Sequence, residues 1–81
     1  MENKHKGFFV ELAQVFKKYQ CTAAFGSKLP ICWVENDRVI GTDKIVEAWI
    51  DRDGEAILRV KSEQPNGFKQ EFEIYSDGRV G

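Results

Sequence analysis

The chain has 81 residues, of which 12 are basic and 13 acidic, and its formal net charge is −1. This balance lacks the basic excess of a non-specific DNA-binding protein, and a hydrophobic content of 42% with only two prolines argues against a disordered chain. A chain of this length forms one domain with a small core. We therefore expect a single domain over residues 1–81.

The first predicted element is an amphipathic helix in residues 8–20. Its apolar side chains recur at spacings of three and four, and polar side chains fall on the opposite side. The apolar stripe consists of Phe8, Leu12, Val15, Phe16 and Tyr19, flanked by Phe9 and Ala13. Gly7 suits the start of this helix, so residues 1–7 are expected to form a mobile tail that contains the one histidine, His5.

The segment after the helix predicts short strands separated by turns. Residues 21–25 alternate as a strand does, and residues 26–28 indicate a turn. Pro30 is compatible with the first position of an apolar strand in residues 30–34. The polar residues 35–38 then predict a hairpin turn into a short strand at residues 39–40.

Residues 44–50 fit either a strand or a short helix capped by Thr42 or Asp43. We predict a strand, because the segment is rich in β-branched and aromatic residues and ends at a tight turn containing Gly54. Strands at residues 56–61 and 68–75 follow, with a turn at residues 65–67 between them. The predicted fold class is α+β, with one N-terminal amphipathic helix packed on a five- or six-stranded antiparallel β-meander.

Alternation with a period of two divides the last three strands into two faces. The apolar face, expected to pack against the helix, carries Val46, Ala48, Ile50, Ala56, Leu58, Val60, Phe68, Phe72 and Ile74. The mixed face carries Ile45, Glu47, Trp49, Ile57, Arg59, Lys61, Lys69, Glu71, Glu73 and Tyr75.

Aromatic and arginine side chains on the mixed face are typical anchors of protein interfaces. We therefore expect partner-binding residues at Trp49, Ile57, Arg59 and Tyr75, joined by Trp33 if the early strands fold over this face. Cross-strand pairs of aromatic and charged residues also stabilise an exposed face without any partner, so that alternative stays open.

Residues suited to catalysis or metal binding are sparse. His5 is expected in the tail, away from any nucleophile, and Cys21 and Cys32 with one histidine do not supply four zinc ligands. Residues 51–55 resemble a calcium-binding loop only faintly and are interpreted as a hairpin turn. We expect no catalytic residue, no metal and no cofactor.

The N-terminal residues are polar and lack the apolar run of a signal peptide. No segment approaches the roughly 20 apolar residues that span a bilayer, so no membrane partner is expected. The expected location is the cytoplasm, where Cys21 and Cys32 would stay reduced and act as small buried hydrophobic residues.

One block of sequence resembles the opening of small accessory proteins encoded by phages and prophages. It runs Phe8-Phe9-Val10-Glu11-Leu12-Ala13-Gln14-Val15-Phe16-Lys17-Lys18-Tyr19 and is followed at once by a predicted strand. The resemblance implies a protein of the infected host's cytoplasm that binds a host or phage protein. Inhibitors of host defence, including anti-CRISPR proteins, belong to that broad class.

The leading hypothesis is a non-enzymatic protein-binding module, an inhibitor or adaptor that acts on a host protein. A second hypothesis is a self-associating domain, because a sheet with apolar residues on both faces can pair with a second copy as a homodimer. A third hypothesis is binding of single-stranded nucleic acid by aromatic and cationic residues of the mixed face. Glu47, Glu71 and Glu73 on the same face would repel phosphate.

Overall fold

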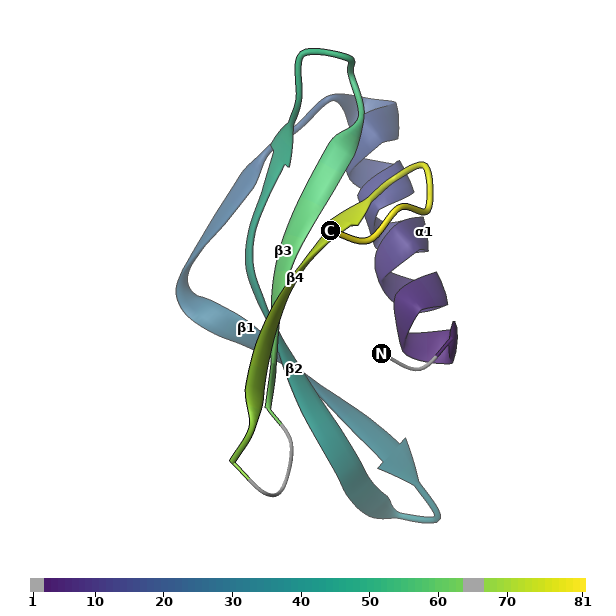
Figure 1. The fold of residues 1–81 in the computed structure, drawn as a ribbon, viewed down its shortest axis with the longest axis vertical. Coiled ribbons are helices and arrows are strands. Elements are labelled where there is room, and N and C mark those ends of the chain that lie inside the picture. The colour runs from purple at the N-terminus through teal and green to yellow at the C-terminus, as the bar shows by residue number, and fades with distance from the viewer. Residues whose placement is uncertain (1–2, 64–66) are drawn as a thin grey trace.

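The computed structural model describes residues 3–63 and 67–81, apart from the side chains of residues 3, 4 and 25–29. Helix α1 (Asn3–Tyr19) is followed by four strands, β1 (Ala23–Glu35), β2 (Arg38–Ile50), β3 (Ala56–Glu63) and β4 (Lys69–Tyr75). The strands form an antiparallel sheet in the order β1-β2-β3-β4, and α1 lies against one side of it (Figure 1). The chain then turns back along β4, where Val80 forms an isolated bridge to Ile74. The expected fold class is confirmed, with four long strands and a fifth segment reduced to this bridge.

Strand β1 is continuous where the sequence predicted two short strands and a turn. Its backbone stays extended through residues 26–28, the expected turn. The pairing with β2 instead shifts between Ala24 and Leu29, so the extra residues of β1 form a bulge. A bulge absorbs additional residues while the chain keeps its direction. A glycine in this segment therefore marks a distortion of the strand and not a chain reversal.

Strand β2 likewise joins two expected strands, at residues 39–40 and 44–50, into one. Gly41 lies inside it and pairs with Trp33, next to a second register shift between Trp33 and Val34. The prediction of a strand at residues 44–50, in preference to a helix, is confirmed.

The turns at the two ends of β2 have the geometry that the sequence indicates. At the tip of the β1–β2 hairpin, Asn36 and Asp37 have φ values of 51° and 61°, as a two-residue type I′ turn requires. After β2, Asp51 Oδ1 accepts hydrogen bonds from the backbone N–H groups of Asp53 (2.9 Å) and Glu55 (3.0 Å). These bonds make residues 51–55 a structural turn. The turn expected at residues 65–67 lies outside the described residues except for its last residue.

Helix α1 begins four residues before the expected start at Gly7. Residues 3–7 are therefore helical, and the prediction that they belong to a mobile tail is wrong. A Cβ atom added at Gly7 would meet nothing within 4 Å, so the packing here does not require a residue without a side chain. Its cost to helix stability, about 1 kcal/mol relative to alanine, is evidently offset by packing of the turns on either side.

The buried stripe of α1 is rotated by about one residue from the predicted one. Phe9 and Ala13, expected only to flank the stripe, are fully buried, whereas Phe8, Val15 and Tyr19 are exposed. The small side chain of Ala13 allows the helix backbone to approach the sheet closely, and Phe9 fills the space one turn away.

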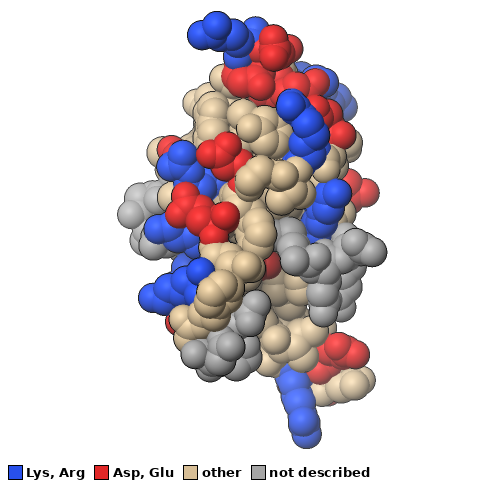
Figure 2. All heavy atoms as spheres, in the orientation of Figure 1, with Lys and Arg blue, Asp and Glu red and all other residues tan. Residues whose placement is uncertain are grey.

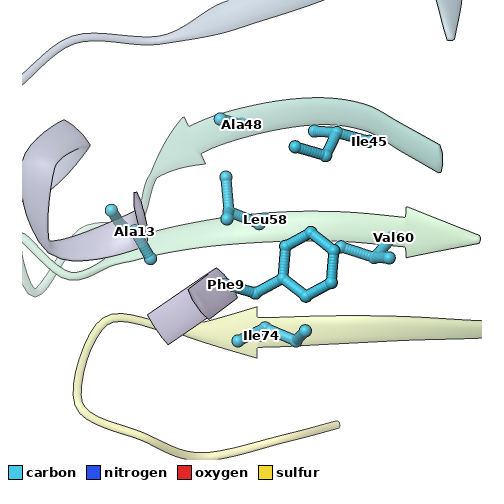
Figure 3. Close-up of a cluster of buried hydrophobic side chains, with 8 residues drawn as sticks. Phe9, Ala13, Ile45, Ala48, Leu58, Val60 and Ile74 are labelled. Atoms are coloured by element: carbon cyan, nitrogen blue, oxygen red, sulfur yellow. The ribbon is translucent and has the colours of Figure 1, made fainter. Parts of the chain in front are cut away.

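The core lies between α1 and the sheet face formed by β2, β3 and β4. The ring of Phe9 lies over β3 and β4 beside Leu58, Val60 and Ile74, and all four side chains are fully buried (Figure 3). Burial of one large apolar side chain contributes about 1.5–3 kcal/mol. Phe9 is the largest of the fully buried side chains, so it is the main link between helix and sheet.

A register shift in β2 decides which of its side chains face the helix. The shift lies between Ile45 and Glu47, at Val46, and it places Ile45 opposite Val60. Ile45 is fully buried and belongs to the core, not to the mixed face as expected, because the extra residue breaks strict alternation. The prediction that Phe68 lies on the apolar face of the last strand is also wrong, since Phe68 is exposed and precedes the first residue of β4.

A polar cluster ties the C-terminal half of α1 to the ends of β3 and β4. Lys17 Nζ lies 2.7 Å from Glu55 Oε1, and Ser76 Oγ donates a hydrogen bond to Glu55 Oε2. The hydrogen bonds from Lys17 and Ser76 lower the pKa of Glu55 below its usual value. Ser76 Oγ also accepts a hydrogen bond of 3.0 Å from the buried N–H of Ala56.

Candidate functional site

The sheet face turned away from α1, here called the outer face, is not covered by any other element among the described residues (Figure 1). Its side chains come from β2, β3 and β4 and form rows across the strands. The rows are Trp49, Ile57 and Tyr75; Glu47, Arg59 and Glu73; Lys44, Lys61 and Glu71; and Thr42, Glu63 and Lys69. Acidic and basic side chains are interspersed on the flank of the molecule away from α1 (Figure 2). From Glu47 onward, the structure groups these residues on one face as the alternation predicted.

The first row is an apolar strip across three strands. Trp49 and Tyr75 both pair with Ile57, which is only 5% exposed because it lies between the two larger side chains. The Arg59 guanidinium carbon lies 5.2 Å from the centroid of the Trp49 ring, and that of Arg79 lies 4.4 Å from the Tyr75 ring. Each ring therefore already has a cation against one face.

Arg59 is the centre of an ion-pair network in the second row. Its Nη1 lies 2.6 Å from Glu47 Oε1, its Nε 3.3 Å from Glu71 Oε1 and its Nη2 4.0 Å from Glu73 Oε1. The groups are partly exposed, so each pair contributes at most about 1 kcal/mol. Three carboxylates around one guanidinium leave the centre of the outer face negatively charged.

The third row places two like charges at directly opposed positions of neighbouring strands. Lys44 stands opposite Lys61 across β2 and β3, and Lys61 Nζ is 3.9 Å from Glu71 Oε2. The neighbouring surface forms a hollow of about 280 Å³. It is lined by Thr42, Lys44, Lys61, Ser62, Glu63, Lys69, Gln70 and Glu71.

Sequence reasoning missed Lys44 because uninterrupted alternation assigns it to the apolar face. The register shift at Val46 moves it to the outer face, beside Lys61. A charged residue at an expected core position is the signal in the sequence that could have revealed a bulge at this point.

Trp33 does not join the outer face. Its indole Nε1 donates a hydrogen bond of 2.7 Å to Oδ2 of the buried Asp43, and its ring meets Phe8 and Phe9 edge-on. The His5 ring stacks on it with the centroids 3.8 Å apart and the planes 8° apart. Trp33 was expected to join the outer face, but it faces α1. His5 was expected in a mobile tail, but it belongs to the helix.

The tip of the β1–β2 hairpin is a second surface that the sequence did not single out. Val34, Val39 and Ile40 are 60%, 62% and 41% exposed. Thr42 is the first residue of β2 that pairs with β3, and these three residues lie on the hairpin side of it, so the hairpin projects past the rest of the sheet (Figure 1). A run of apolar residues predicts a strand, but it does not reveal that the strand extends beyond its neighbours.

Cys21 and Cys32 are both exposed free thiols, so the expectation that they are buried is wrong. Cys21 follows the end of α1, and Cys32 lies on β1, the edge strand. Within the described residues, no three side chains of the metal-binding types form a group able to hold an ion. The described helix is not long and apolar enough to cross a membrane.

The fold and the outer face together define a small α+β domain with one open sheet face. No family model matches the chain, and neither a curated protein nor a solved structure does. The chemistry of the outer face is therefore the basis for assigning a function.

Proposed function

We propose that this protein is a non-enzymatic protein-binding module whose partner docks on the outer face. The observation that carries this proposal is the open side of the sheet, where Trp49, Ile57 and Tyr75 form one apolar strip. Tryptophan, tyrosine and arginine are the residue types that most often anchor protein interfaces. The strip is bordered on one side by the Arg59 network, so apolar and polar groups adjoin on this face as they do in protein interfaces.

The surroundings of the two rings favour a protein over single-stranded nucleic acid. Bases stack on open aromatic faces, and nearby cations neutralise the phosphates. Here Arg59 and Arg79 already occupy one face of Trp49 and Tyr75. The charge of Arg59 is also matched by three carboxylates of the same face. A phosphate backbone would meet net negative charge next to the aromatic strip.

The kind of partner is suggested by the resemblance of residues 8–19 to phage and prophage accessory proteins. On this basis, the protein acts in the cytoplasm of an infected cell as an inhibitor or adaptor that binds a host protein. The helix itself supports this role indirectly. Packing of Phe9 and Ala13 holds α1 on the opposite side of the sheet, which leaves the outer face free.

The test is affinity capture from bacterial lysate with four forms of the tagged protein: unaltered, Trp49→Ala, Tyr75→Ala and Tyr19→Ala. Tyr19 is the matched control, because it is an exposed aromatic residue at the end of α1. We expect a stoichiometric partner that is captured by the unaltered protein and Tyr19→Ala but lost with the two outer-face variants. Circular dichroism must show that all four forms are folded.

Retention of every captured protein by Trp49→Ala and Tyr75→Ala would refute docking on the outer face. Sedimentation of the purified protein provides the comparison with self-association. A mass of twice 9.3 kDa that returns to the monomer in Trp49→Ala would assign the face to a second copy and refute a host partner there.

A further inference from the structure

Three lysines from three neighbouring strands surround the hollow at the far end of the outer face. Lys44 and Lys61 occupy directly opposed positions on β2 and β3, where Cβ atoms are about 4.5–5.5 Å apart and like charges destabilise the sheet. Lys69 adds a third ammonium group from β4, and all three residues line the hollow. An arrangement that weakens the isolated protein is expected where a ligand of opposite charge binds.

The acidic residues of the hollow offset these charges only in part. Glu71 is shared, since it lies 3.3 Å from Arg59 and 3.9 Å from Lys61. Within the described chain, Lys44 and Lys69 form no ion pair within 4.0 Å. With Glu71 counted in the hollow and Glu47 and Glu73 counted with Arg59, three ammonium groups face the two carboxylates of Glu63 and Glu71, which leaves an excess of one positive charge in the hollow.

We propose that the hollow binds a carboxylate side chain of the protein partner, an inference that rests on the proposed function. A carboxylate carries one negative charge and balances the excess. A phosphate dianion would bring more negative charge beside Glu63 and Glu71. Lys44 and Lys61 would hold the carboxylate by charge-assisted hydrogen bonds, and the Thr42 hydroxyl group lies in the adjacent row.

The spacing of the rows defines what the partner must present. Ile57 of the apolar strip and Lys61 of the hollow are four residues apart on β3. Four residues of extended strand span about 13 Å. An extended segment that runs along β3 would therefore place an acidic side chain about four positions from an apolar anchor, with the Arg59 network between them.

The inference can be tested on the purified protein without the partner. A ¹⁵N-labelled sample is titrated with a capped tetraglutamate peptide, and resonances near Lys44, Lys61 and Lys69 are followed by NMR. We expect saturable shifts confined to the hollow and about tenfold weaker binding in Lys44→Gln, as loss of one charged hydrogen bond predicts. Lys18→Gln, on the exposed side of α1, is the matched control and should bind as the unaltered protein does.

Inorganic phosphate and a single-stranded oligothymidylate are the comparison ligands. Absence of saturable shifts, or equal binding by Lys44→Gln, would overturn the site. Tighter binding of either phosphate ligand would overturn the carboxylate assignment. This titration does not use the Trp49 and Tyr75 variants, so the two tests can give different results. Absence of tetraglutamate binding together with capture of a partner through the apolar strip would refute only the carboxylate site. Tetraglutamate binding in the hollow without such capture would refute only docking on the apolar strip.

Discussion

Replacement of Lys44 by glutamate should make the free protein more stable. The change turns a cross-strand lysine pair into an opposite-charge pair with Lys61. Opposite charges at such positions contribute about 0.2–1 kcal/mol, and like charges oppose folding. Both residues are only partly buried, so the lower part of this range applies to the repulsion that is lost and to the attraction that is gained. Together the two effects should stabilise the folded state by about 0.5–1 kcal/mol. In a domain of this size, that corresponds to a rise in Tm of about 3–6 °C.

Urea unfolding followed by circular dichroism measures this gain, at low salt and again at about 0.5 M salt, where surface charges are screened. A double-mutant cycle with Lys61→Glu isolates the interaction between positions 44 and 61. The explanation fails if Lys44→Glu is destabilising, if the gain persists unchanged at high salt, or if the coupling energy is zero. A stable Lys44→Glu variant that no longer binds tetraglutamate would show that Lys44 serves binding at the expense of stability.

Three further changes address the fold. Phe9→Ala should lower the free energy of unfolding by about 3–5 kcal/mol, because it empties the centre of the core, and urea unfolding measures this loss. Ser76→Ala should cost about 1–3 kcal/mol in the same assay, since the buried N–H of Ala56 loses its acceptor. The pKa of Glu55 is lowered in the folded protein, so Glu55 stabilises the fold fully above its unfolded-state pKa of 4.5. This stabilisation is lost as pH falls through the folded-state pKa. Unfolding midpoints measured between about pH 6 and pH 3 should therefore decline less steeply in Glu55→Gln, and equal slopes would contradict the linkage.

The helix illustrates how far a periodic pattern determines packing. A period of 3.6 residues correctly predicts an amphipathic helix, but adjacent stripes of α1 both contain apolar residues at the required spacing. Phe9 and Ala13 form the stripe that is buried, although the alanine side chain offers little apolar surface. Its importance lies in its small size, which matters only once the sheet is placed against it.

The sequence predicted which residues form the candidate site only after the inserted residue of β2, Val46. From Glu47 onward, alternation brings Trp49, Ile57 and Tyr75 together as expected. Before that point the bulge reverses the faces, so Lys44 lies in the hollow. The fold tolerates this insertion because hydrogen bonding resumes after a local shift, and the one sign of it in the sequence is the charge of Lys44 at an expected core position.

Trp33 shows a different limit, because a strand pattern does not determine which layer a residue contacts. Its side chain packs under α1 because Asp43 accepts its indole hydrogen bond and His5 stacks on its ring. Asp43 is 10 residues away on the neighbouring strand β2 and His5 lies on α1, and neither was expected to lie near the core. Contacts of this kind are set by the assembled fold, so they become apparent only from the structure.

The placement of the core on one side of the sheet separates stability from binding in this protein. Phe9, Leu58 and Val60 are buried between α1 and the sheet face that packs against it. The charged rows of the outer face contribute little to folding, because their ion pairs are partly solvated. Substitutions on the outer face should therefore change binding with small effects on stability. Lys44 is the sharpest case, since its expected effects on the two properties have opposite signs.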